Sequence, residues 1–187
     1  MITKIILIGM PAVGKTTIGK ILANKLHYQF IDLDAQIQQS CGVDIARIFA
    51  LEGEKSFRIR ETNELKKILN ITQNYILSLG GGCVLSEINR TLLRKDPENI
   101  IIYLDANHDV LASRVIKSID KRPIFHKLQS NHNADIVQAR VLDSVVELYA
   151  ERKQLYEEIA NITINISTLA PNQVVIKIIN SLKIDDF

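Results

Sequence analysis

Eight residues near the start of the chain, Gly9 to Thr16, have the types and spacing that bind the phosphate groups of a nucleotide. Their sequence, GMPAVGKT, matches the pattern G-x-x-x-x-G-K-[ST] at every fixed position. A loop that contains glycine can turn a run of backbone N–H groups inward around a phosphate. Lys15 would then contact the outer phosphates, and the Thr16 hydroxyl could ligate Mg2+. The spacing therefore predicts a phosphate-binding loop with a magnesium ion beside it.

The segments on either side of this loop are those that a phosphate-binding loop requires. Lys4 to Ile8 is a short apolar run, which predicts a buried strand. After the loop, apolar residues recur at helical spacing, at Ile18, Ile21, Leu22 and Leu26. We expect the positive N-terminal end of this helix to face the phosphates.

Three aspartates are candidates for binding the metal or a substrate hydroxyl. Asp32 and Asp34 lie where a second strand, Tyr28 to Asp32, is predicted to end, and residues two apart on a strand share a face at about 6.6 Å. Ligands of an open parallel sheet bind beyond the carboxyl ends of its strands, although Asp34 would also suit a helix N-cap. Asp105 follows the clearest buried strand, Ile100 to Leu104, and this pattern by itself favours Asp105 for Mg2+.

The arginines differ in the acidic residues near them. Arg58 has Glu54 four residues before it and Glu61 three after it, so a surface ion-pair network accounts for it. Arg114 has no acidic residue one helical turn away.

Arg152 is expected on the apolar stripe of a long helix, Ala134 to about Ile159. Its neighbours one turn away carry no charge; they are Leu148, Tyr149, Leu155 and Tyr156. A guanidinium in such a place needs a partner from elsewhere. That partner is either a distant carboxylate of the protein or an anionic ligand.

Two further segments carry no apolar periodicity. Gly80 to Gly82 follows a predicted strand, Tyr75 to Leu79, and offers either backbone that a ligand can approach closely or a flexible turn. Residues 118–133 form a long basic stretch, and loops of this length in compact domains act as lids or linkers. We interpret residues 118–133 as a lid.

The elements that must position these residues alternate between strand and helix along the whole chain. This alternation predicts an α/β fold with a parallel sheet, five strands in our count, and helices on both faces. We expect residues 1–187 to form a single domain.

Composition excludes several classes of protein. A net charge of +2 without a basic stripe argues against a nucleic-acid partner, and no apolar run is long enough to span a membrane. Cys41 and Cys83 are far apart without a C-x-x-C motif, so we expect reduced thiols and a cytoplasmic protein. The chain also runs directly into its first strand, which leaves no room for a signal peptide.

In their order and spacing, these motifs resemble the shikimate kinase family from about Ile5 to Val175. Besides the phosphate loop, the matches are Phe30-Ile-Asp32-Leu-Asp34; Ile48-Phe49, Gly53-Glu54, Phe57-Arg58 and Glu61; Gly80 to Gly82; Arg122-Pro123; and Glu151-Arg152, Leu155-Tyr156 and Ala160. The chain departs from the family at Pro11, at Ala12, where glycine is usual, at Gln38, where an acid is usual, and at Ile124-Phe125.

The resemblance implies a P-loop kinase of the nucleoside-monophosphate-kinase-like fold, with strand order 2-3-1-4-5. It implies ATP-dependent phosphorylation of the shikimate 3-hydroxyl, a step toward chorismate and the aromatic amino acids. The implied partners are the small molecules shikimate and ATP, with Mg2+ as cofactor. We expect a monomer that binds neither nucleic acid nor membrane.

The resemblance also implies roles for individual residues. Those expected to bind ATP are Ala12, Val13, Gly14, Lys15, Thr16, Thr17, Arg114 and Arg122, with the Ser167 to Pro171 loop beside the adenine. Those expected to bind shikimate are Asp34, Arg58, Gly81 and Arg152, from the helical segment 34–62 and beyond it, and the two arginines would hold its carboxylate. The expected catalytic residues are Lys15, Asp34 and Arg122.

For the metal, the resemblance implies Thr16 and Asp32, with Asp32 acting through water, and leaves Asp105 as a turn residue.

Three other functions are less well supported by the sequence. Another small-molecule kinase of this fold, such as a gluconate or nucleotide kinase, is disfavoured because two arginines, together with Asp34, are available to bind a substrate with one carboxylate. A nucleotide-binding regulator without turnover is disfavoured by the complete set of Lys15, Thr16, Asp32 and Asp34. A GTPase would carry N-K-x-D, which this sequence lacks.

Overall fold

The apolar runs of the sequence form one five-stranded parallel sheet in the order β2-β3-β1-β4-β5. The structure is a computed structural model, and it describes residues 4–119, 125 and 134–182. The strands are β1 (Lys4–Ile8), β2 (Gln29–Asp32), β3 (Tyr75–Ser78), β4 (Asn99–Asp105) and β5 (Ile162–Asn165). Every residue of β1 is buried, as expected of a central strand that is covered on both faces. The predicted fold class and strand order are therefore confirmed.

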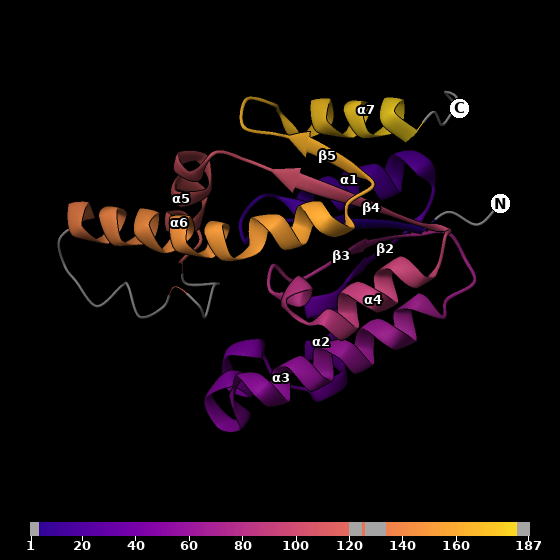
Figure 1. Ribbon diagram of the computed structural model, residues 1–187, viewed down its shortest axis with the longest axis horizontal. Helices are drawn as coiled ribbons and strands as arrows, with labels where there is room; N and C mark the ends of the chain where they lie inside the picture. Colours follow the sequence, from indigo (N-terminus) through magenta and orange to yellow (C-terminus); the bar gives the residue numbers. More distant parts are fainter. Residues whose placement is uncertain (1–3, 120–124, 126–133, 183–187) are drawn as a thin grey trace.

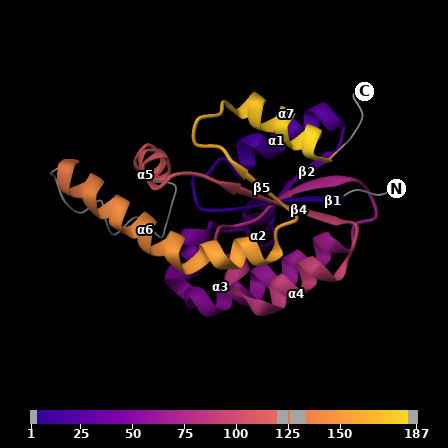
Figure 2. The ribbon, with the colours of Figure 1, turned by 45° about the horizontal axis from the view of Figure 1, so that its top comes forward.

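Helices cover both faces of this sheet (Figures 1 and 2). The helices are α1 (Lys15–Leu26), α2 (Leu33–Cys41), α3 (Ile45–Leu69), the short 3-10 turn η1 (Cys83–Leu85), α4 (Glu87–Lys95), α5 (His108–Ile116), α6 (Ala134–Ile159) and α7 (Pro171–Leu182). Helices α1 and α7 pack together on one face, while α3, α4 and α6 lie on the other (Figure 2). Helices α2 and α3 pair beside the edge strand β2, and α5 packs on α6.

Side-chain caps and glycines decide where the helices on the β2 side begin and bend. Asp44 caps α3 by accepting a hydrogen bond from the Arg47 N–H at 2.7 Å, and aspartate is among the residues favoured at this position. Gly53 has φ 78°, a conformation that glycine adopts readily, and α3 therefore bends there. The bend lets one helix contribute residues to the cleft on both sides of Gly53.

The boundary between β2 and α2 differs from the prediction. Asp32 is the last residue of β2 and the N-cap of α2, because its side chain accepts a hydrogen bond from the Ala35 N–H at 3.3 Å. Asp34 is therefore in the first turn of a helix, so the prediction that the two carboxylates share one strand face is wrong. The suggestion that Asp34 is the N-cap is wrong for the same reason.

Among the described residues, no helix is both long and apolar enough to cross a membrane.

Candidate active site

The phosphate loop connects β1 to α1 at the carboxyl edge of the sheet. Gly9 and Gly14 have φ of 141° and 110°, and Ala12 adopts the left-handed conformation with φ 65°. That conformation costs an alanine about 1 to 2 kcal/mol, which is a physical reason for glycine to be preferred at this position. Ala12 keeps the loop geometry at this cost, and the loop opens the cleft where α1 begins.

Lys15 lies across the loop that precedes it. Its Nζ donates to the carbonyl oxygens of Gly9 at 2.8 Å and Met10 at 3.0 Å, and the residue is 8% exposed. From the other side, the Nη1 of Arg114 donates to the Val13 carbonyl at 2.8 Å. Lys15 and Arg114 thus bind three carbonyl groups of the loop, those of Gly9, Met10 and Val13, and backbone N–H groups of such a loop can bind a phosphate.

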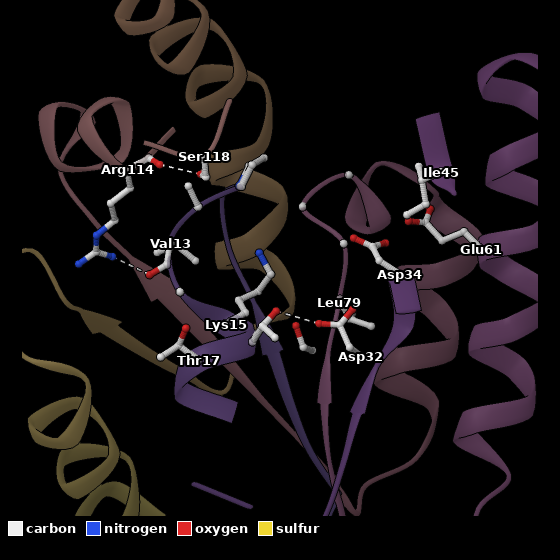
Figure 3. A pocket seen from close by; sticks show the side chains of 18 of the residues that line it. Val13, Lys15, Thr17, Asp32, Asp34, Ile45, Glu61, Leu79, Arg114 and Ser118 are labelled. Carbon is white, nitrogen blue, oxygen red and sulfur yellow. Dashed lines mark hydrogen bonds between the residues drawn. The ribbon is translucent and has the colours of Figure 1, made fainter. Parts of the chain in front are cut away.

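A hydroxyl and a carboxylate meet beside Lys15. The Thr16 hydroxyl donates to Asp32 Oδ2 at 2.8 Å. Figure 3 shows Lys15 and Asp32 near the middle of the cleft, with Arg114 on one side and Asp34 and Glu61 on the other. These oxygen donors are the kind that Mg2+ prefers, and Mg2+ uses one or two carboxylates together with substrate phosphates and water.

Asp105, which the strand pattern favours for the metal, is engaged elsewhere. Its Oδ1 accepts hydrogen bonds from the hydroxyls of Tyr103 and Tyr149, both at 3.0 Å. Its Oδ2 accepts one from the side-chain amide of Asn165 at 3.3 Å. Asp105 does not line the cleft. The interpretation of Asp105 as the metal ligand is therefore wrong. An apolar strand followed by an aspartate does not show which strand end lies beside Thr16, and in the structure it is the end of β2, at Asp32.

The triple glycine joins the phosphate loop to the other half of the cleft. A Cβ on Gly81 would lie 2.8 Å from the Pro11 ring, and one on Gly80 would lie 2.8 Å from Asp34 Oδ1. A Cβ on Gly82 would lie 2.5 Å from Arg58 Nη2. Glycine therefore lets the backbone approach Pro11 and these side chains closely. Gly80 to Gly82 form a turn that packs on both sides, as the close-approach alternative predicts.

Arg58 forms the ion pairs with Glu54 and Glu61 that its neighbours in the sequence predict, but these pairs are not confined to the surface. Its side chain is 23% exposed and lies between Glu54, at 2.9 Å, and the fully buried Glu61, at 3.0 Å. The sequence indicates Glu61 as an ion-pair partner of Arg58 and as a matched family residue, but helical spacing does not reveal what α3 packs against, and therefore does not predict the burial of Glu61.

Burial raises the pKa of the Glu61 carboxyl to about 7, against the lowering effect of the Arg58 guanidinium. The nearby Asp34 and Glu54 carboxylates raise it further. Glu61, Glu54 and Asp34 all line the cleft with Arg58, so this half of it holds three carboxylates near one guanidinium. A group that titrates near neutral pH in a cleft is a candidate functional residue.

Arg152 reaches the cleft from α6 and is 4% exposed. Its Nε lies 3.1 Å from Glu151 Oε2, so the prediction that its protein partner would be distant in the sequence is wrong. Successive side chains on a helix point in different directions, but both of these are long enough to meet. The Glu151 side chain is 52% exposed, so this pairing places only one of the two charges in the interior.

One continuous cleft of about 1600 Å3 contains these groups, enough for two small ligands side by side. It is lined by all the described residues that the sequence assigns to ATP, shikimate or Mg2+, which are Ala12, Val13, Gly14, Lys15, Thr16, Thr17, Asp32, Asp34, Arg58, Gly81, Arg114 and Arg152. At the nucleotide end, Ile166, Leu169, Pro171 and Val174 add apolar surface from the segment around the start of α7.

Arg122 and most of the predicted lid, residues 120–124 and 126–133, lie outside the described residues. Of the remainder, Ser118 lines the cleft, and Ile119 and Phe125 are buried at 8% and 1% exposure. The lid therefore stays a prediction.

Comparison with known proteins agrees with this geometry. The family model for shikimate kinase matches residues 11–183. A shikimate kinase of Neisseria meningitidis serogroup C (strain 053442) is 40% identical over 161 residues, which are 86% of each chain. One of Nitrosomonas europaea is 40% identical over 180 residues, which cover 96% of this chain and 78% of the relative.

A solved structure shows the same arrangement. Shikimate kinase from Acinetobacter baumannii in complex with shikimate superposes with a TM-score of 0.84 at 30% identity, and the match covers 98% of this chain and 94% of that one. The matched family model covers the phosphate loop from Pro11 onward, together with the triple glycine and Arg152. The chain therefore belongs to the shikimate kinase family, and its activity is that of a shikimate kinase.

Proposed function

We propose that the cleft binds ATP with Mg2+ at its phosphate-loop end and shikimate between α2, α3 and α6, and that it transfers the γ-phosphoryl group to the 3-hydroxyl of shikimate. Membership of the family implies the use of ATP. The observation that carries the proposal is the triple glycine, which packs against Pro11 of the phosphate loop and against Asp34 and Arg58. Nucleotide and acceptor would therefore meet at Gly80 to Gly82.

The residues at the nucleotide end can bind and orient the phosphates. Lys15, already directed to the loop centre, would follow the transferred group as a positive charge. The Thr16 hydroxyl and the Asp32 carboxylate, 2.8 Å apart, fit Mg2+, which neutralises phosphate charge when it is bound. Arg122, placed in the lid by the sequence, stays a predicted phosphate contact.

The residues at the acceptor end can bind a carboxylate and a hydroxyl. The planar guanidinium groups of Arg58 and Arg152 suit a carboxylate, which can accept two parallel hydrogen bonds from one guanidinium and a further hydrogen bond from the other. Asp34 lies beside Gly80 and lines the same cleft as these arginines and the phosphate loop, where a carboxylate can orient an attacking hydroxyl and accept its proton. We further propose a monomeric enzyme of the cytoplasm, which the free thiols of Cys41 and Cys83 suit.

Replacing Arg152 with lysine tests the assignment of the acceptor site. A hydrogen bond to a charged group contributes about 1.5 to 3 kcal/mol, so Arg152→Lys should weaken shikimate about 10- to 150-fold. Titrations of shikimate and ATP should be run side by side, with Arg140→Lys, an exposed arginine on the same helix, as the control. We expect the KM for ATP to stay the same in both variants. Equal losses for the two ligands would show that Arg152 is a structural residue.

A further inference from the structure

Tyrosines on α6 fix the helix on both sides of Arg152. Tyr149, three residues before Arg152, donates its hydroxyl to Asp105 Oδ1 at the end of β4. Tyr156, four residues after Arg152, donates its hydroxyl to the backbone carbonyl of Gly81. Residues at these spacings lie along one side of a helix. The backbone of Arg152 is therefore fixed between two contacts with the edge of the sheet.

Tyr156 is the more informative of the two because its contact reaches the triple glycine. Tyr156 is 1% exposed and is not among the residues that line the cleft. Burial raises the pKa of its hydroxyl, and the nearby Arg152 only partly offsets this effect. The hydroxyl therefore keeps its proton and remains a donor to Gly81. Its neighbours, Arg152 and Gly81, both line the cleft.

The ring of Tyr156 is itself oriented from the sheet. It stacks on the ring of Tyr103 with centroids 5.0 Å apart. The Tyr103 hydroxyl donates to the same Asp105 Oδ1 that accepts from Tyr149. Asp105 thus accepts hydrogen bonds from Tyr149, which is on α6, and from Tyr103, which stacks on Tyr156.

We propose that Tyr156 is a positioning residue for shikimate, which fixes the side chain of Arg152 relative to the backbone of Gly81 without touching the substrate. The inference rests on the proposed function, in which Arg152 and Gly81 border the shikimate carboxylate. A loss of the hydroxyl would leave the half-buried Gly81 carbonyl without this donor and would free α6 to shift. Small displacements of this kind weaken a bidentate contact because its geometry is narrow.

Removing the Tyr156 hydroxyl while keeping the ring tests this inference. In Tyr156→Phe, the stack on Tyr103 remains, whereas the hydroxyl's hydrogen bond to Gly81 and its interaction with the Arg152 side chain are lost. The net contribution of one hydrogen bond predicts a rise of about 3- to 10-fold in the KM for shikimate. The KM for ATP and kcat should stay within about twofold, because neither atom of the bond belongs to the phosphate loop. A structural defect alone would not separate the two substrates in this way.

A matched control is Tyr75→Phe. Tyr75 is also a fully buried tyrosine, at the start of β3 and thus at the opposite end of that strand from the triple glycine, and its hydroxyl has no hydrogen-bond partner among the residues described. We expect Tyr75→Phe to leave the KM of both substrates unchanged. If Tyr156→Phe folds too poorly to assay, Tyr103→Phe, which loses the bond to Asp105, should raise the KM for shikimate in the same direction by a smaller factor.

Combining variants separates this inference from the proposed site. Arg152→Lys and Tyr156→Phe should be non-additive in the KM for shikimate, since both act on one contact. If Arg152→Lys leaves shikimate binding unchanged, the proposed acceptor site is wrong. If Arg152→Lys weakens shikimate but Tyr156→Phe does not, or if Tyr156→Phe affects ATP equally, the inference about Tyr156 alone is overturned.

Discussion

The buried carboxyl of Glu61 makes the stability of the unliganded protein depend on pH in an unusual direction. Its pKa is raised from an ordinary value of 4.5 to about 7, chiefly by burial. A group whose pKa is raised on folding binds its proton more tightly in the folded state. The free energy of unfolding should therefore fall as the pH rises from about 4.5 to about 7, and this contribution should be constant above that range.

The size of this effect follows from the interval between the two pKa values. At 1.36 kcal/mol per pH unit, it amounts to at most about 3 kcal/mol, of which about 2 to 3 kcal/mol falls between pH 5 and pH 8. Glu61→Gln removes the titration and retains an oxygen that can accept a hydrogen bond from Arg58. As the pH rises from 5 to 8, the free energy of unfolding should therefore fall by about 2 to 3 kcal/mol less in this variant than in the natural protein.

Urea unfolding at pH 5, 6, 7 and 8, without ligands, measures this difference. Glu52→Gln is the control, because hydrogen bonds from Ser56 and Arg60 lower the pKa of this exposed carboxyl. The stability that ionised Glu52 contributes is present above pH 4.5 and is lost only below it. The free energy of unfolding of Glu52→Gln should therefore change between pH 5 and pH 8 with the same slope as that of the natural protein. If Glu61→Gln has the same slope as the natural protein, Glu61 is ionised throughout and our account of its burial is wrong.

Two further substitutions test the nucleotide end of the cleft. Lys15→Ala should lower kcat at least ~100-fold, the scale of deleting one electrostatic stabiliser, and near-normal kcat in a folded variant would contradict the role given to Lys15. Asp32→Asn should raise the Mg2+ concentration for half-maximal rate roughly tenfold. Asparagine is also a good N-cap, so α2 should persist in this variant, and an unchanged Mg2+ requirement would exclude Asp32 from the metal site.

The fold could be predicted from the sequence because its signals are local. Apolar runs such as Ile100 to Leu104 and the alternation of strand and helix indicate a parallel sheet, and the observed β4 extends that run by one residue at each end. Asp44 and Gly53 act on the backbone beside them, so the start and the bend of α3 were also predictable. The family resemblance supplied the strand order, which periodicity alone does not contain.

The site could be predicted from residue spacing only where the residues that act together are neighbours in the sequence. Gly9 to Thr16 carry their own geometry, whereas the choice between Asp32 and Asp105 depends on which strand end Thr16 approaches. The burial of Glu61 depends on the packing of α3 against the triple glycine, which no spacing reveals.

Tyr156 was visible in the sequence only as part of the apolar stripe of α6. Its hydroxyl reaches Gly81, 75 positions away in the chain. Apolar periodicity treats tyrosine as a hydrophobic residue and does not indicate where its hydroxyl finds a partner. A contact of this kind requires the three-dimensional structure.

Release of ADP from ATP and Mg2+, measured with and without shikimate, tests the central claim most directly. We predict that ADP appears at a rate that saturates with shikimate, that one shikimate is consumed per ADP, and that the background without an acceptor is low. Gluconate at the same concentrations should not replace shikimate, since the cleft would have to hold a flexible open chain in place of a ring. ADP release that is independent of shikimate, or equally fast with gluconate, would contradict the account.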